Sequence, residues 1–293
     1  MEKFDLIILG SGPGGYVTAI RASQLGLKTA IIEKESLGGV CLNWGCIPTK
    51  ALLKSAQVFD YIKHSEDYGI SVENYDKNFD NVINRSRKVA QTMSKGVTFL
   101  MKKNNIKIFE GFGKLSPNKT INITDQNGSE SKITGEKIII ATGARSRELP
   151  FLKKDGKRII GYREAMTLDK QPKDIVIVGS GAIGIEFAYF YNSMGTSVTI
   201  VEYMDRIVPV EDSEISKELE KSLKKKGINI LTSTEVEKAE INSSNTVDVT
   251  LKTSNGKKNI INTEIVLSAV GIKTNIENIG LEDLGIKIEK DKI

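Results

Sequence analysis

Cys41 and Cys46 are the only cysteines of the 293-residue chain. Two thiols at this spacing can hold a metal ion, exchange electrons or remain inert. A structural zinc ion needs four ligands, and two cysteines with a single histidine, His64, do not supply them. Structural disulfides are rare in the cytoplasm, where we expect this protein, so the pair favours redox chemistry. Spacing alone leaves two inert thiols as an alternative.

The residues around the cysteines indicate how the pair is presented. Pro48 fits the first turn of a helix, because its missing N–H is not needed there. Cys46 then lies just before a helix N-terminus, where the helix dipole lowers the pKa of a thiol and favours the thiolate. Gly45 and the pair Gly38–Gly39 give the backbone the freedom for a loop that folds Cys41 back toward Cys46.

An internal repeat supplies the elements that must position these residues. In the first copy, an apolar run at 6–9 leads into a glycine turn at 10–15, a helical pattern and a second apolar run at 29–32. The second copy has the same order at 175–178, 179–184 and 198–201. The second apolar runs end in Glu33 and Glu202, each 23 positions after the first glycine of its turn.

Each copy reads as strand, glycine turn, helix, strand and acid. The first glycine makes the tight turn, the second lets a pyrophosphate approach the backbone, and the third lets the helix pack on the strand. The helix N-terminus holds the phosphate charge, and the acid accepts hydrogen bonds from ribose hydroxyls. One glycine motif is weak evidence, but the full context occurs twice. We therefore predict two dinucleotides, one in each of two domains.

The fold class that follows is α/β, with two Rossmann-like dinucleotide-binding domains. A helical pattern at 79–101 and β segments near 106–108, 120–124 and 138–140 lie between the copies, with a turn at 126–128. After the second copy we expect a helix at 214–226 and β segments near 228–231, 247–251 and 265–270. A boundary near Pro150 divides the chain into domains at 1–149 and 150–271.

Composition narrows the classes of partner. Hydrophobic residues make up 39% and charged residues 27%, which is typical of a globular protein. The net charge is +5, and the densest basic run, Lys224–Lys226, reads as the solvated end of a helix, so we predict no nucleic-acid partner. No apolar stretch reaches the roughly 20 residues that cross a bilayer. The start of the chain leaves no room for a leader before the run at 6–9, which predicts a cytoplasmic protein without a membrane partner.

The segment that carries the cysteines resembles a known family. Residues 38–53 read GGVCLNWGCIPTKALL. This string is similar to the redox-active site of the pyridine nucleotide–disulfide oxidoreductases, and within them to the dihydrolipoyl dehydrogenase group. Glutathione reductases more typically show CVNVGCVPKK. Thioredoxin reductases of similar length carry C-x-x-C in the NAD(P) domain, where this chain has no cysteine.

The resemblance implies a redox-active disulfide and a role for each of its neighbours. Cys41 would be the interchange thiol that meets the substrate, and Cys46 would lie against the flavin as a charge-transfer thiolate. Lys50 would sit near the flavin N5 and pair with Glu186 from the NAD domain. From spacing alone, Lys50 and Glu186 are ordinary surface charges.

The resemblance also implies FAD in the first glycine turn and NAD in the second, the FAD/NAD(P)-binding fold. NAD is expected rather than NADP, because Glu202 would repel a 2′-phosphate and Tyr203-Met204 follow where NADP-specific relatives tend to place arginines. The residues assigned to FAD are Gly10, Gly12, Pro13, Gly14, Gly15, Glu33, Lys34, Gly39, Val40, Cys41, Cys46, Lys50, Gly113, Ala141, Thr142 and Gly143. Those assigned to NAD are Gly179, Gly181, Ala182, Ile183, Gly184, Glu202 and Gly271.

After Gly271 the chain departs from the family pattern. Relatives usually read G-R-x-P-N, whereas Ile272 takes the place of the arginine, so any contact of that arginine is in doubt. Full-length members continue into a second FAD segment and a dimer-interface domain, whose His–Glu pair serves the partner subunit. His64 lies in a polar stretch and does not match that histidine. We expect 272–293 to begin a return to the FAD domain and be cut short, leaving a fragment that binds FAD weakly and lacks normal turnover.

The activity implied by the resemblance is oxidation of protein-bound dihydrolipoyl groups, with electrons passing through the disulfide and FAD to NAD. The partners would be lipoyl domains of 2-oxoacid dehydrogenase or glycine cleavage complexes, and the full-length family forms homodimers. Two alternatives stay open. One is another flavoprotein disulfide reductase, similar to mercuric or glutathione reductase. The other is a non-catalytic, truncated nucleotide-binding fragment.

Overall fold

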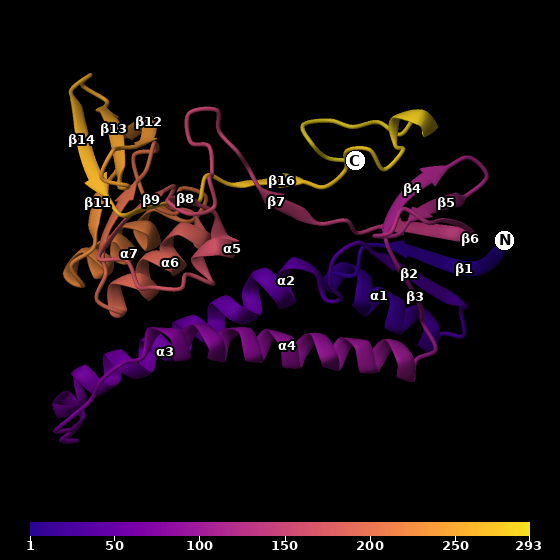
Figure 1. Ribbon diagram of the computed structural model, residues 1–293, viewed down its shortest axis with the longest axis horizontal. Coiled ribbons are helices and arrows are strands. Elements are labelled where there is room, and N and C mark those ends of the chain that lie inside the picture. The colour runs from indigo at the N-terminus through magenta and orange to yellow at the C-terminus, as the bar shows by residue number, and fades with distance from the viewer. The chain divides into compact units, whose positions relative to one another are not determined.

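The computed structural model describes residues 1–293 and has the predicted α/β architecture (Figure 1). The chain forms two compact units, which we describe separately. Unit 1 contains 1–48, 87–145 and 273–293, and unit 2 contains 49–86 and 146–272. No helix is both long and apolar enough to cross a bilayer.

Unit 1 is built on a six-stranded sheet with the order β3-β2-β1-β6-β5-β4. Strands β3, β2, β1 and β6 pair in parallel, whereas β4, β5 and β6 pair antiparallel. Helix α1 packs along β1 and β2 (Figure 1). The bounds are β1 Glu2–Leu9, α1 Pro13–Gln24, β2 Thr29–Glu33, β3 Lys107–Glu110, β4 Phe112–Ser116, β5 Thr120–Thr124 and β6 Glu130–Ile140.

The apolar run at the end of β1 is buried on both faces, as a central parallel strand requires. Ile8 packs with α1 residues and with Val97 and Met101 of helix α4 (Phe79–Lys103). Ile7 faces the opposite core, which includes Ile279 from the end of the chain. The segment after 272 therefore belongs to the core of unit 1, and the main-chain N–H of Leu115 donates to the Ile279 carbonyl at 2.8 Å.

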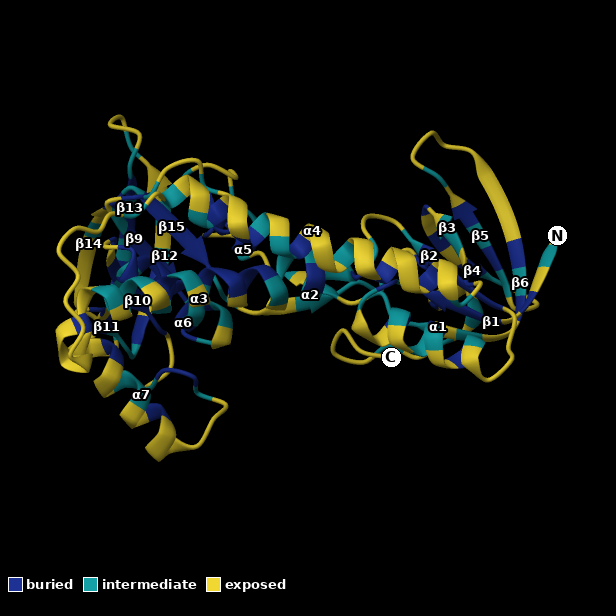
Figure 2. Cartoon of the chain, turned by 90° about the horizontal axis from the view of Figure 1, so that it is seen from below, coloured by how far each residue is buried: buried dark blue, intermediate teal, exposed yellow.

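Unit 2 repeats the architecture with a five-stranded sheet in the order β11-β10-β9-β15-β8, all of it parallel. Strand β15 is buried along its whole length (Figure 2). A three-stranded antiparallel sheet, β12-β13-β14, packs over the same core. The bounds are β8 Ile159–Ile160, α5 Tyr162–Ala165, β9 Asp174–Val178, α6 Ala182–Ser193, β10 Ser197–Val201, α7 Ser213–Lys225, β11 Asn229–Leu231, β12 Thr234–Ile241, β13 Val247–Thr253, β14 Lys258–Thr263 and β15 Ile265–Ser268.

The remaining elements connect these sheets. Strands β7 (Ala144–Ser146) and β16 (Ile272–Thr274) form a two-stranded sheet. The cysteine segment differs from the expected loop, because Cys41 lies in a short helix, α2 (Gly39–Trp44). Helix α3 (Cys46–Lys63) begins at Cys46 itself, two residues before Pro48, because no residue of a first helical turn needs to donate an intrahelical hydrogen bond. Short 3₁₀ turns occupy Ser65–Tyr68 and Glu282–Leu284.

Candidate active site

Cys41 and Cys46 form a disulfide, with their Cα atoms 4.7 Å apart. The bond joins α2 to the first turn of α3, and Gly45 between them approaches α2 closely enough that a Cβ there would lie 3.1 Å from the Val40 carbonyl oxygen. Cys41 is half-buried against the core that holds Leu42, whereas Cys46 is exposed. The structure thus decides between the paired and the inert alternatives in favour of the pair.

Hydrogen bonds from polar side chains of the loop and of α4 hold the disulfide loop in place. The Asn43 side chain donates to the carbonyls of Leu37 and Gly39, at 3.0 and 2.9 Å, and accepts from the Ser94 hydroxyl at 2.7 Å. Arg87 donates through Nη2 to the Asn43 carbonyl at 2.7 Å, and its guanidinium lies 4.3 Å from the ring centre of Trp44. Arg87 Nη1 is buried without a partner, and burial lowers the pKa of this guanidinium.

Replacing Arg87 is expected to loosen this loop. Arg87→Gln removes the cation over Trp44 and the hydrogen bond to Asn43, which lowers the free energy of unfolding by about 1–2 kcal/mol. Removal of a partly buried charge offsets part of this loss. Trp44 is the only tryptophan of the chain, so its emission reports this one loop. We expect a shifted emission maximum and a melting temperature lower by roughly 2–8 °C. Lys88→Gln, an exposed neighbour on α4, is the control, and equal behaviour of the two variants would contradict the assignment.

The first glycine turn lies directly against the disulfide loop. Gly39 touches Gly12, since a Cβ on Gly39 would lie 2.6 Å from the Gly12 Cα, and the Gly38 N–H donates to the Ser11 carbonyl at 3.1 Å. Gly10 has a φ of +102°, and Gly15 packs onto the Gly10 carbonyl without room for a side chain. A Cβ on Gly12 would meet nothing within 4 Å.

The second glycine turn repeats this geometry in unit 2. Gly179 has a φ of +98°, and Gly184 packs against its carbonyl oxygen, while Gly181 faces open space. Gly12 and Gly181 each precede a helix that receives no side-chain cap. Pro13 brings no N–H to α1, and the Gly15 N–H donates to the Gly12 carbonyl at 2.8 Å, so the first turn of α1 offers the N–H of Gly14, whereas α6 begins with those of Ala182 and Ile183. Open space in front of uncapped N–H groups fits the pyrophosphate of a dinucleotide in both turns.

The acids of the repeat are held by serines that sequence reasoning overlooked. Ser11 donates to Glu33 Oε2 through its N–H at 2.9 Å and its hydroxyl at 2.5 Å. Ser180 donates to Glu202 Oε2 in the same two ways, at 2.8 and 2.6 Å. Both serines are fully buried. The signal was present in the sequence, because the same residue follows the first glycine in both copies.

The other predicted contacts fall around these two turns. The N–H of Ala141 donates to the Leu9 carbonyl at 2.7 Å, which places the 141–143 turn beside Gly10. Gly113 is buried in β4 against Leu9, so packing already accounts for that glycine. The remaining predicted residues are at the surface or partly buried: Pro13, Gly14, Lys34, Val40, Thr142, Gly143, Ala182, Ile183 and Gly271.

Lys50 and Glu186 form an ion pair within unit 2. Glu186 lies on α6 one turn after the glycine turn, and its side chain is 29% exposed, against 62% for Lys50. A surface pocket of about 370 Å³ adjoins the pair and is lined by Lys50, Leu53, Lys54, Gln57 and Tyr189. His64 is exposed, and its Nδ1 contacts the Asp60 carbonyl at 2.8 Å, so the structure gives it a local role only.

Comparison with known proteins adds evidence that is independent of the site geometry. A family model described as pyridine nucleotide-disulphide oxidoreductase matches residues 4–293. A dihydrolipoyl dehydrogenase of Rhizobium etli is 49% identical over 99% of this chain and 63% of its own length. That of Zymomonas mobilis is 44% identical over 99% of this chain and 62% of its own length. The chain thus spans a little over three fifths of the curated relatives it matches.

Solved structures agree with this relationship. The crystal structure of LpdA from Mycobacterium tuberculosis superposes with a TM-score of 0.89 at 26% identity, covering 99% of this chain and 63% of LpdA. RclA of Escherichia coli, described as an HOCl-induced flavoprotein disulfide reductase, has a TM-score of 0.84 at 26% identity and covers all of this chain and 62% of its own.

Proposed function

Because the chain belongs to the pyridine nucleotide-disulphide oxidoreductase family, we propose that it carries the redox-active disulfide and the nucleotide-binding domains of a dihydrolipoyl dehydrogenase. In this proposal a dihydrolipoyl group on a partner protein is oxidised to its disulfide, and NAD is the final electron acceptor. The partners would be the lipoyl domains of 2-oxoacid dehydrogenase or glycine cleavage complexes.

The observation that supports this proposal best is the contact between the disulfide loop and the first glycine turn. Gly39, two residues before Cys41, lies against Gly12, whose free side faces open space. A dinucleotide bound over that turn would therefore lie next to a disulfide. Few protein functions need these two features side by side, and transfer of electrons between a dithiol and a flavin is one of them.

The chemistry assigned to the cysteines is thiol–disulfide exchange. One substrate thiolate attacks Cys41 Sγ, the Cys41–Cys46 bond breaks, and Cys46 leaves as a thiolate. The second substrate thiol then displaces Cys41, so that the substrate becomes a disulfide and the protein holds two reduced cysteines. Two electrons enter the protein in this exchange, and Cys46 at the N-terminus of α3 is stabilised as the thiolate by the helix dipole.

Two cofactors complete the assignment. FAD would accept the electron pair from the cysteines and NAD would take it as a hydride. The turn at 10–15 with Glu33 would hold the first, and the turn at 179–184 with Glu202 the second. Lys50, paired with Glu186, would present its ammonium to the isoalloxazine ring.

The decisive test is the visible spectrum of the FAD-loaded chain. Addition of one equivalent of dihydrolipoamide is expected to produce a long-wavelength charge-transfer band, and Cys46→Ser to abolish it. Cys41→Ser leaves Cys46 as a free thiolate and is the matched control, expected to show the band before any reductant is added. Absence of flavin binding, or an unchanged spectrum in the unmodified chain, would contradict the proposal.

The fold similarity to RclA supports a second candidate, a disulfide reductase with another substrate. Assays with lipoamide, glutathione and mercuric ion on the same preparation separate the two. Faster reoxidation of the reduced chain by lipoamide than by the other substrates is expected under the first proposal.

A further inference from the structure

Asn275 joins the last segment of the chain to the predicted flavin contact at Thr142–Gly143. Its main-chain N–H donates to the Gly143 carbonyl at 2.9 Å, and its side-chain Nδ2 donates to the Thr142 carbonyl at 3.0 Å. Gly143 has a φ of +70°, which glycine adopts about as readily as a negative φ, so its own preference does not define the turn. Two hydrogen bonds from one residue therefore define the path of the turn.

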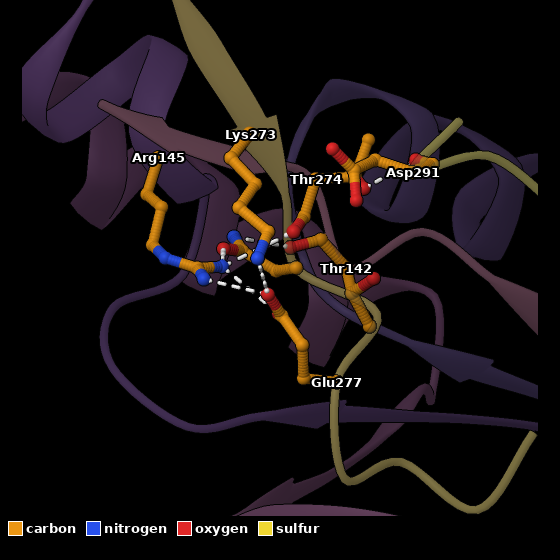
Figure 3. A network of polar contacts seen from close by, with 7 residues as sticks. Thr142, Arg145, Lys273, Thr274, Glu277 and Asp291 are labelled. Atoms are coloured by element: carbon orange, nitrogen blue, oxygen red, sulfur yellow. Dashed lines mark hydrogen bonds and ion pairs between the residues drawn. The ribbon is translucent and has the colours of Figure 1, made fainter. Parts of the chain in front are cut away.

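Arg145 fixes the orientation of the Asn275 amide. Its Nη1 donates to Asn275 Oδ1 at 2.9 Å and to the Thr274 carbonyl at 3.1 Å (Figure 3). A guanidinium only donates and a main-chain carbonyl only accepts, so the amide oxygen must face Arg145 and the amide nitrogen must face Thr142. Only an amide can satisfy both neighbours at this position.

Glu277 in turn holds Arg145. Its carboxylate accepts from Nη1 at 3.0 Å and from Nη2 at 2.7 Å, a two-point contact, and Lys273 Nζ lies 2.8 Å from Oε1 (Figure 3). The hydrogen bonds from Arg145, and then from Lys273, hold the pKa of Glu277 well below its usual range. The pair is 47% and 39% exposed, and exposed pairs add little to stability, so the contact serves orientation more than folding.

We propose that Asn275, oriented by Arg145 and Glu277, is a positioning residue that sets the Thr142–Gly143 turn for the FAD nucleotide. This inference rests on the proposed function, together with the assignment of Ala141, Thr142 and Gly143 to FAD that the family resemblance implies. It also gives the segment after residue 272 a part in the flavin site. That part comes from Asn275 and Glu277 and not from Ile272, which is exposed.

The test compares three variants of the whole 293-residue chain. Asn275→Asp keeps an oxygen for Arg145 but turns a carboxylate toward the Thr142 carbonyl, and Glu277→Gln weakens the hold on Arg145. Glu289→Gln is the matched control, because it breaks the exposed Lys287–Glu289 pair in the same segment without touching Asn275. We expect the dissociation constant for FAD to rise about tenfold in Asn275→Asp and about threefold in Glu277→Gln, with no change in the control.

A second measurement needs no flavin. In the flavin-free protein, amide hydrogen exchange at 141–145 is expected to be about tenfold faster in Asn275→Asp than in the control, with melting temperatures within about 2 °C. Unchanged exchange overturns the inference, and so does faster exchange with unchanged FAD affinity. An unmodified chain that binds no FAD would instead contradict the proposed function, and exchange at 141–145 would still decide whether Asn275 sets the turn.

Discussion

The Gly184→Ala variant is expected to melt at a clearly lower temperature than the unmodified chain, whereas Gly181→Ala is expected to fold normally and bind NADH poorly. A Cβ on Gly184 would lie well under 3.0 Å from the Gly179 carbonyl oxygen, a main-chain atom that can move only with β9. Alanine gains at most about 1 kcal/mol of helix propensity over glycine. Forcing the helix from its strand costs about 3 kcal/mol or more, so the clash prevails.

The Gly181→Ala variant separates the phosphate role of the turn from its folding role. Gly181 has φ −66° and ψ 179°, which alanine adopts without strain, and its Cβ would meet no protein atom within 4 Å. The methyl group would occupy the space assigned to the pyrophosphate, so the dissociation constant for NADH should rise at least about tenfold.

Thermal melts and NADH titrations of the two variants decide this prediction. The expected fall in melting temperature for Gly184→Ala is roughly 6–12 °C. A Gly184→Ala protein that melts like the unmodified chain would show that α6 is not held this tightly. Undiminished NADH affinity in Gly181→Ala would show that the nucleotide does not cross that glycine.

The second large effect concerns the serines of the repeat, where each variant serves as the control for the other. Ser180→Ala removes the hydroxyl that holds Glu202 Oε2 but leaves the main-chain N–H in place. A hydrogen bond to a charged group contributes about 1.5–3 kcal/mol, and without it only the main-chain N–H groups of Ser180 and Met204 hold the nearly buried carboxylate toward a ribose. Ser11→Ala does the same to Glu33 in unit 1.

We expect Ser180→Ala to weaken NADH binding about tenfold and to leave FAD affinity unchanged, and Ser11→Ala to have the opposite selectivity. Both affinities are measured on the flavin-free protein, because under the proposed function NADH would transfer a hydride to bound FAD. Loss of the same ligand in both variants would contradict the assignment of one nucleotide to each turn.

Much of the fold was predictable because its signals are local. The apolar runs at 6–9 and 175–178 became the central strands β1 and β9, and the pattern that starts at Phe79 became α4. The predicted turn at 126–128 lies between β5 and β6, and Gly128 there has a φ of +82°. In each case side-chain periodicity, or the backbone freedom of a glycine, acts over a few residues. The division into domains at 1–149, 150–271 and 272–293 stays a prediction.

The cysteine segment shows where local reasoning ends. Spacing left inert thiols open and suggested a loop at Cys41, whereas the structure pairs Cys41 with Cys46 and places Cys41 in α2. Packing of Leu42 and Cys41 against β1 and α4 supports that short helix, and such contacts join residues more than 30 positions apart. Helices this short are not stable by themselves, so only tertiary contacts decide them.

The two glycine turns and their acids were recognisable in the amino-acid sequence, because sterics and charge select those residue types over a few positions. The tertiary structure alone decided which groups meet. Ser11 reaches Glu33 across 22 positions, and Asn275 reaches Thr142 across 133. These contacts depend on the order of the strands in the sheet and on the path of the chain after β15. The repeated serine marks the first contact in the sequence, but nothing local marks the second, because it depends on how the end of the chain returns to unit 1.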